Sequence, residues 1–181
     1  GTMFWTRVLL GVIVGALFFG FLYANLRFAR LPLPGDVTFI GRRLLPEEER
    51  EQVEQYADRG LLVFAIVGGL MAGVMASAHW VEYLQFTHAV PFNHTDPIFG
   101  RDVGFYVFRL RFIEFIWRSI YHALLVTFVI SVLVHLYQEA IRLVGNTVQA
   151  IPRARAHSLG LLAAALLVKI YGYRLDQYNL L

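Results

Sequence analysis

Long apolar stretches alternate with polar connecting segments along this chain. Apolar residues dominate at about residues 8–26, 61–80, 117–137 and 159–178. A helix needs about 20 mostly apolar residues to cross about 30 Å of hydrocarbon, and each stretch meets or nearly meets that length. The pattern therefore predicts four transmembrane helices in a single transmembrane domain over residues 1–181.

Composition supports this prediction and excludes other classes of protein. The chain is 57% hydrophobic and 16% charged, and its 181 residues leave no room for a substantial soluble domain. It contains no cysteine, which excludes disulfides and thiolate metal sites. A net charge of +3 is too small to predict binding of nucleic acid. We expect an all-α integral membrane helical bundle whose partners are the lipid bilayer and other membrane subunits.

The arginines of the connecting segments predict the orientation. Segments 27–60 and 138–158 together carry nine: Arg27, Arg30, Arg42, Arg43, Arg50, Arg59, Arg142, Arg153 and Arg155. The opposite side carries five: Arg7, Arg101, Arg109, Arg111 and Arg118. Because basic residues concentrate in cytoplasmic loops, segments 27–60 and 138–158 are predicted to be cytoplasmic and 81–117 to lie outside. Both chain ends then lie outside, which leads us to expect a fragment or partial copy of a longer protein.

The first connection divides into two parts. Residues 31–36 contain two prolines and a glycine, which predicts an extended, turning segment. Pro46 then opens a helix, and the three glutamates that follow it suit the positive end of a helix dipole. Val53, Tyr56 and Gly60 share one face of this helix. We expect an amphipathic helix on the cytoplasmic surface, with docking of a partner protein as the alternative.

The outer segment is the most unusual part of the sequence. Asp96 and Pro97 form a good N-cap and first position for a short helical turn, which should end at Gly100. The segment is too apolar for a free loop and should lie along the membrane interface, because it contains Phe99, Phe105, Tyr106, Phe108 and Phe112.

The polar residues of the outer segment allow two interpretations. The side chains of His88, His94, Asp96 and Asp102 are of the kinds that ligate metals, although their spacing matches no established ligand pattern. The interpretation that we favour is structural and involves no metal. Aspartates beside proline and glycine commonly accept hydrogen bonds from the backbone, and here they would also pair with Arg101 or Arg109.

The outer segment also carries a resemblance. Residues 96–108 read Asp-Pro-Ile-Phe-Gly-Arg-Asp-Val-Gly-Phe-Tyr-Val-Phe. This string resembles the signature of a family of large bacterial multi-pass membrane proteins, the uncharacterised protein family (UPF) 0182. The chain departs from the family pattern just afterwards, where Leu110-Arg111-Phe112 replaces the usual Leu-Pro-Phe.

Two further stretches extend the resemblance over nearly the whole chain. Residues 4–7 and 23–26 resemble the start and end of the family's second helix, and residues 173–181 resemble the end of its fifth. The resemblance implies a partial copy that holds helices two to five of about seven, in the bacterial cytoplasmic (inner) membrane. It implies that the family's first helix, last helices and large extracytoplasmic domain are absent, and it supplies no catalytic residue.

Small residues recur at helical spacing in the first two predicted spans. The second span places them at every fourth position, and the first contributes a pair; they are Ala65, Gly69, Gly73, Ser77, Gly11 and Gly15. Small residues let helix backbones approach closely in lipid. We interpret these positions as tight packing within the chain, with a dimerisation face as the alternative.

The third predicted span carries a polar seam. Thr127, Ser131, His135 and Glu139 recur at every fourth position and so share one face. A histidine within a membrane-spanning helix is by default a candidate functional residue. His135 could belong to a proton path or ligate a pigment or haem metal. We favour packing through hydrogen bonds between helices.

The fourth predicted span carries a charge at mid-membrane. Lys169 lies about halfway along it, and Asp176 follows seven residues later on the same face. An unpaired lysine at that depth is costly, so we expect burial beside Asp176 or a backbone carbonyl, with a transport site as the alternative.

The leading functional prediction is a non-catalytic scaffold or accessory subunit of a larger membrane assembly. No pairing of a nucleophile with a base is visible, so an enzyme is not expected. One alternative is a transporter or lipid-handling protein. Another is a pigment- or haem-binding subunit, for which His79, His122 and His135 are the candidate ligands. The sequence indicates no cofactor. Lipid and pigment are the two alternatives for a bound molecule.

Overall fold

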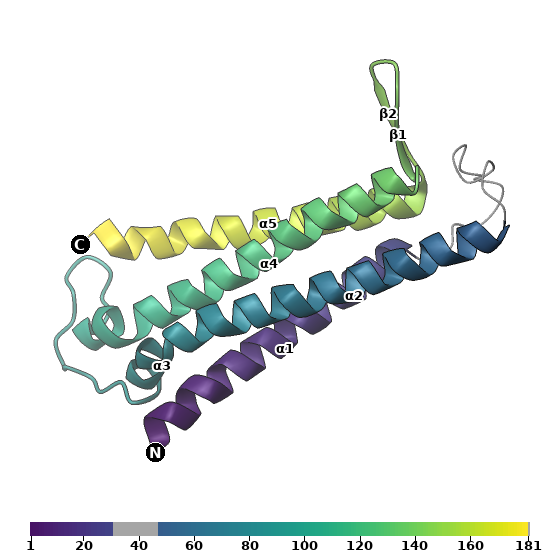
Figure 1. Cartoon of the computed structure of the whole chain (residues 1–181). Coiled ribbons are helices and arrows are strands. Elements are labelled where there is room, and N and C mark those ends of the chain that lie inside the picture. The colour runs from purple at the N-terminus through teal and green to yellow at the C-terminus, as the bar shows by residue number, and fades with distance from the viewer. Residues whose placement is uncertain (31–46, 181) are drawn as a thin grey trace.

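The computed structural model describes residues 1–30 and 47–180, and four long helices dominate it (Figure 1). Each is long and apolar enough to cross a membrane. Helices of 26 to 32 residues extend about 39–48 Å, which exceeds the hydrocarbon thickness of a bilayer. The predicted all-α membrane bundle is confirmed. Its long helices are α1 (Thr2–Arg30), α2 (Glu47–Ala78), α4 (Leu110–Tyr137) and α5 (Pro152–Gln177).

Short elements connect the long helices. A π-helical segment leads directly into α4, and an antiparallel hairpin joins α4 to α5. That hairpin was not predicted; its tight turn uses Gly145 at a φ of 58°, a conformation that glycine adopts without strain. The short elements are α3 (Trp80–Thr87), η2 (Phe105–Arg109), β1 (Ile141–Val144), β2 (Thr147–Ala150) and η3 (Tyr178–Leu180).

The long helices form two antiparallel pairs. Helix α1 packs along α2, α4 packs along α5, and α1 also contacts α4. Both chain ends, α3 and residues 88–104 gather at one end of the bundle, which we call the motif end (Figure 1). We call the opposite end, where α1 ends and β1 and β2 project, the hairpin end.

Helix α2 differs from the prediction in one respect. The segment expected to form a separate surface helix is helical, but it continues without a break into the second span. A single glycine at position 60 does not interrupt it, because one glycine within a helix costs only about 1 kcal/mol. An ion pair of 3.0 Å between Arg30 and Asp58 also fixes this part of α2 to the end of α1.

The other long helices extend beyond the predicted spans. They begin at Thr2, Leu110 and Pro152, several residues before the predicted starts. The turn predicted at residues 31–36 and the proline at position 46 lie outside the described residues.

The buried core is thin and divided. One cluster joins α1 to α2 around Leu22, Leu26 and Ala65, and a second joins α4 to α5. Only 11% to 28% of the most apolar stretch of each span is buried within the chain. Most residues of each span are therefore half-buried or exposed on the surface of the chain. The second cluster consists of Leu124, Leu161 and Ala165.

Candidate functional site

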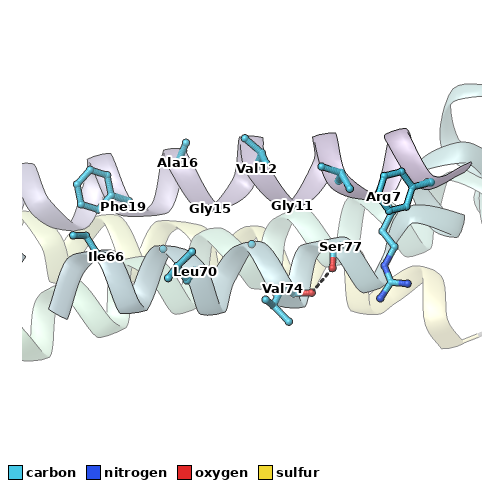
Figure 2. A pocket seen from close by; sticks show the side chains of 14 residues that line it. Arg7, Gly11, Val12, Gly15, Ala16, Phe19, Ile66, Leu70, Val74 and Ser77 are labelled. Carbon is cyan, nitrogen blue, oxygen red and sulfur yellow. Dashed lines mark hydrogen bonds between the residues drawn. The ribbon is translucent and has the colours of Figure 1, made fainter. Parts of the chain in front are cut away.

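The glycines of α1 and α2 bring the two backbones into contact. A Cβ atom added to Gly11 would lie 2.8 Å from the carbonyl oxygen of Gly73, and one added to Gly15 would lie 2.8 Å from that of Gly69. Ser77 follows on the same face and donates a hydrogen bond of 2.7 Å to the Val74 carbonyl of its own helix (Figure 2). The structure thus uses the small-residue face within one chain.

An apolar groove lies over this glycine contact. It encloses about 560 Å³, and side chains of α1 and α2 flank it on its two sides (Figure 2). Arg7 lies at its motif end, and Phe19 with Ile66 at the other. Because several flanking side chains are largely exposed, the groove opens toward the surroundings of the chain. Its flanks include Val12, Ala16, Leu70 and Val74.

Asp96 organises the turn at the motif end. Its carboxylate accepts hydrogen bonds from the backbone N–H of Phe99 at 2.7 Å and of Ile98 at 3.2 Å, and from the Tyr106 hydroxyl at 3.1 Å. Its carbonyl accepts one from the N–H of Gly100 at 2.9 Å, which closes the turn that begins at Pro97. Burial raises the pKa of Asp96, but the hydrogen bonds lower it more, so that its pKa lies below its ordinary value.

Asp102 fixes the other side of the same loop. One carboxylate oxygen accepts hydrogen bonds from the backbone N–H of Phe92 at 3.0 Å and of Gly104 at 2.7 Å. The hydrogen bond from Phe92 is the main reason that the pKa of Asp102 lies below its ordinary value. A short antiparallel bridge between Thr95 and Asp102 closes the loop. Both aspartates therefore stabilise the loop by accepting hydrogen bonds from its backbone N–H groups.

The metal hypothesis gains no support from this geometry. Within residues 1–30 and 47–180, no group of three or more histidine and acidic side chains could hold a metal ion. The ring of His88 contacts the Leu84 carbonyl at 3.1 Å, whereas His94 takes part in the loop through its backbone carbonyl. Among the described residues, no ion pair joins Asp96 or Asp102 to Arg101 or Arg109, and Arg101 lies instead over the ring of Phe105 at 5.3 Å.

Aromatic residues of the motif cover the end of α5. Tyr178 is surrounded by the rings of Phe99, Phe105 and Tyr106, with centroid separations of 5.2, 5.4 and 6.1 Å. Phe108 stacks on Phe92 at 5.6 Å in the same region. The motif loop is thus an apolar cap on the bundle, held in shape by two carboxylates.

Two histidines meet inside the bundle near the hairpin end. Nε2 of His135 on α4 lies 3.1 Å from Nδ1 of His157 on α5, and Nε2 of His157 lies 3.2 Å from Oδ1 of Asn25 on α1. His135 is 2% exposed. The sequence identified His135 but missed its partners, because His157 fell in the predicted loop. Pro152 was the available signal, since proline commonly occupies the first position of a helix.

The contacts of Asn25 determine which atom donates and which accepts in each hydrogen bond of this network. The Asn25 amide donates to the Phe21 carbonyl at 2.8 Å, so its oxygen faces His157 and accepts from Nε2–H. Nδ1 of a neutral His157 is then an acceptor, and Nε2–H of His135 donates to it. Nδ1 of His135 is left as a buried acceptor without a partner among the described residues.

Further unpartnered polar atoms lie along the predicted seam. Thr127 and Ser131 are fully buried, and neither hydroxyl has a hydrogen-bond partner among the described residues. Glu139 does not belong to the seam, because α4 ends at Tyr137 and Glu139 pairs with Arg142 at 3.0 Å. A buried hydroxyl without a partner is destabilising, and the hydrogen bonds between helices that we expected along this seam are confined, among the described residues, to His135. Oε1 of Gln138 and Oγ of Ser158 are likewise buried without a partner in the part of the chain that the structure describes.

Polar contacts tie all four long helices together at the hairpin end. Besides its ion pair to α2, Arg30 accepts a hydrogen bond of 3.5 Å through its carbonyl from the amide of Gln138. Arg153 at the start of α5 donates to the Phe28 carbonyl at 3.1 Å and lies 4.5 Å from the centre of the Phe28 ring. With the histidines and Asn25, these contacts make a continuous polar lock, a name that we keep for them.

Lys169 is held by aromatic rings. Its ammonium lies 5.6 Å from the ring centres of Trp117 and Tyr121 and 5.3 Å from that of Tyr173. Among the described residues, no ion pair joins Lys169 to Asp176, which lies seven residues further along α5. Cation–π attraction replaces the ion pair that we expected.

Comparison with known proteins assigns the family. The model of the Uncharacterised protein family (UPF0182) matches residues 1–181. The chain belongs to this family. It is 31% identical to a UPF0182 protein of Mycobacterium leprae (strain TN), 32% to one of Mycobacterium marinum and 30% to one of Mycobacterium tuberculosis. Each comparison covers 99% of this chain but 18% of the relative, so the chain spans about a fifth of their length. No solved structure matches.

The remaining histidine candidates of this UPF0182 chain lie in the motif half of the bundle. His79 and His122 line one cavity between α1, α2 and α4, far from His135 at the opposite end. His79 stacks on Phe115 with ring centres 4.2 Å apart and contacts Glu82 at 3.4 Å. The three candidate ligands for a pigment or haem therefore do not converge on one site.

Proposed function

We propose that this segment of a UPF0182 protein is a non-catalytic scaffold, and that the apolar groove between α1 and α2 receives a further transmembrane helix of a larger membrane assembly. The groove carries this proposal. Small residues at its floor allow the backbones of α1 and α2 to touch, so that an incoming helix meets a shallow, apolar surface (Figure 2). Two further features of the chain support it.

The first supporting feature is the small share of each span that the chain buries by itself, between 11% and 28%. The second is length, since the relatives are more than five times longer than the stretch that they share with this chain. A long relative has additional chain available to cover these helices. The polar lock would give such an assembly a rigid support at one end.

Cross-linking from the groove tests the proposal. A photoreactive residue at Val12 or Leu70 should form adducts with protein in native membranes, because both side chains flank the groove. Leu167 on α5 is the matched control, since it is 67% exposed and lies outside the groove. Lipid adducts alone from all three positions would contradict the scaffold proposal.

We also propose that the hairpin end faces the cytoplasm of a bacterial inner membrane, on the basis of the arginine distribution. The chain has no cysteine, so introduced cysteines report without background. A cysteine at Asn146, in the hairpin turn, should resist an impermeant thiol reagent in intact cells, whereas one at Asn93 should react. The reverse labelling pattern would overturn this orientation.

A further inference from the structure

A two-part cleft lies between α1 and α4 in the motif half of the bundle. One part is a charged cavity of about 420 Å³, and the other is an apolar cavity of about 450 Å³. The two parts adjoin, because Val14, Phe18, Phe115 and Ser119 line both of them. None of the residues that line this cleft lines the groove between α1 and α2.

The charged part presents balanced charges. Arg111 and Arg118 lie seven residues apart on one face of α4, with Glu114 between them and Glu82 on α3 opposite. Arg118 is 3.9 Å from Glu114, a long ion pair, and 65% of its side chain is exposed. The side chain of Arg111 makes no hydrogen bond or ion pair to any residue that the structure describes. Two guanidinium groups and two carboxylates therefore face one cavity, which the imidazoles of His79 and His122 also line. Glu82 contacts His79 at 3.4 Å and Glu114 accepts a hydrogen bond from the Asn179 amide, so a ligand would share these carboxylates with them. The guanidinium of Arg111 is unengaged among the described residues.

The apolar part extends the cleft along the helices. Leu10 and Leu17 of α1 and Ile120 and Ala123 of α4 line it, with only Ser119 contributing a polar side chain. Its shape is open, so that the cavity reaches the outer surface of the bundle. The cleft thus combines a charged compartment with an apolar one, as an amphiphilic ligand requires.

The depth of the charged part matches the level of lipid headgroups. Arg118 precedes Tyr137, the last residue of α4, by 19 residues, which is about 28 Å along a helix. This equals the thickness of the hydrocarbon core, about 30 Å. When the hairpin end of α4 lies at one membrane surface, the charged part of the cleft lies at the other.

We propose that this cleft binds one zwitterionic phospholipid with a primary ammonium headgroup, as in phosphatidylethanolamine. Arg111 and Arg118 hold the phosphate, since guanidinium groups match phosphate oxygens in charge and geometry. Glu82 and Glu114 hold the ammonium, and an acyl chain occupies the apolar part. The balanced charge of the lining selects a neutral headgroup, because the carboxylates repel one that is net anionic. This proposal stands independently of the scaffold proposal.

Thermal stability of the delipidated chain in detergent micelles tests the headgroup. Phosphatidylethanolamine should raise the melting temperature at lower lipid concentrations than phosphatidylglycerol does. Replacing both arginines, Arg111→Gln with Arg118→Gln, removes charge-assisted hydrogen bonds and should weaken phosphatidylethanolamine binding about tenfold or more. The matched control is Arg101→Gln with Arg109→Gln, two exposed arginines at the same end that do not line the cleft.

A reversal of lipid preference separates recognition from a merely structural role. Glu82→Gln should weaken binding of phosphatidylethanolamine and strengthen binding of phosphatidylglycerol, because it removes a partner of the ammonium and a source of repulsion. A general loss of folding would not move the two lipids in opposite directions. Equal binding of both lipids by the unmodified chain, or an unchanged preference in Glu82→Gln, would overturn the proposal.

A second substitution tests the apolar compartment. Ala123→Phe fills part of that cavity and should weaken binding of both lipids, while leaving the preference between them intact. Val129→Phe is the control on the same helix, because Val129 is 51% exposed and lies outside the cleft. Equal lipid binding by these two variants would show that no acyl chain enters the cavity, and would also overturn the proposal.

Discussion

The two ends of this bundle handle polar residues in opposite ways. At the hairpin end, Arg30, Asp58, His135 and His157 find partners on other helices of the same chain, and α1, α2, α4 and α5 are joined. At the motif end, Glu114 of α4 accepts a hydrogen bond from Asn179, but the arginines of α4 face an open cleft, and the Arg111 side chain has no partner among the described residues. Polar groups near a membrane thus either join helices or remain available to a ligand, depending on what they face.

The physical reason lies in how helices associate in lipid. Lipid tails are as apolar as leucine, so that close backbone packing and hydrogen bonds hold the helices together. Close backbone packing holds α1 to α2 at the glycine contact, and hydrogen bonds hold the helices together in the polar lock at the hairpin end. Between α1 and α4 at the motif end neither operates, and the helices leave cavities there.

The largest expected effect comes from the glycine contact, on which the positions of α1 at both ends depend. Gly69→Leu with Gly73→Leu should lower the melting temperature in detergent strongly. An added Cβ would lie 2.7 Å from the Cβ of Phe19 at one position and 2.7 Å from the carbonyl oxygen of Gly11 at the other. Overpacking costs about 1–3 kcal/mol at each position.

Gly20→Leu is the control for this experiment, because nothing lies within 4 Å of a Cβ at that glycine. It should leave the melting temperature nearly unchanged. If the double variant melts like the unmodified chain, the contact between α1 and α2 does not hold the bundle together.

The second expected effect concerns the motif half of the bundle, where α4 separates from α1 but remains packed against α5. A Cβ at Gly172 would lie 2.0 Å from Cζ2 of Trp117, whose ring is fixed by a hydrogen bond of 2.6 Å to the Val168 carbonyl. Gly172→Ala should therefore destabilise the chain by about 1–3 kcal/mol, as measured by thermal unfolding. Gly160→Ala, on the same helix with open space around its Cβ, should have little effect.

The third expected effect removes the centre of the polar lock. His157→Ala leaves Nε2 of buried His135 and Oδ1 of Asn25 without their partner, which costs about 1–3 kcal/mol. Hydrogen exchange should speed up at the hairpin end while the motif end keeps its protection. His122→Ala, which removes an exposed imidazole at the motif end, should not reproduce this pattern. Uniformly faster hydrogen exchange over the whole bundle would mean that the polar lock does not act locally.

The architecture was accessible from the sequence, but the lock and the cleft were not. Apolar length alone predicts four spans, and the spacing of Gly69 and Gly73 predicts a close helix contact. The partners of His135 depend on how helices α1, α4 and α5 are rotated against one another, which no local pattern records. Lys169 shows the same limit, because its aromatic partners Trp117 and Tyr121 come from another helix.

Two shorter features illustrate why helix boundaries were missed. The surface helix and the second span appeared separate because their polarity differs, yet backbone hydrogen bonding continues through Gly60 and makes one helix. The hairpin between α4 and α5 was missed because Gly145 and Asn146 form its turn within a segment rich in arginine, which suggested only a polar loop. The polarity of a segment indicates its depth in the membrane, but it does not indicate where a helix ends.

The smallest expected effect is confined to the motif loop and depends on pH. Both carboxyl groups have a pKa below the ordinary value of 3.8 when the loop is formed. The ionised form therefore stabilises the loop; this contribution is complete above the pKa of the unfolded chain and is lost as the pH falls through the lower folded pKa. Between pH 7 and 5 the loop should stay closed, and it should loosen only below about pH 4.

Hydrogen exchange over residues 92–104, taken as a ratio to the Asp96→Asn variant, measures the contribution of Asp96, because the ratio cancels the intrinsic dependence on pH and the titration of Asp102. Asparagine caps a helical turn nearly as well as aspartate, so Asp96→Asn should keep the loop closed at neutral pH, whereas Asp96→Ala should open it. The hairpin end should not respond in any of these variants, because Asp96 contacts nothing there. Loosening between pH 7 and 5 would mean that backbone donors do not hold the carboxylate. Elemental analysis supplies the decisive alternative, because a stoichiometric metal that disappears in Asp96→Asn would make the loop a metal site.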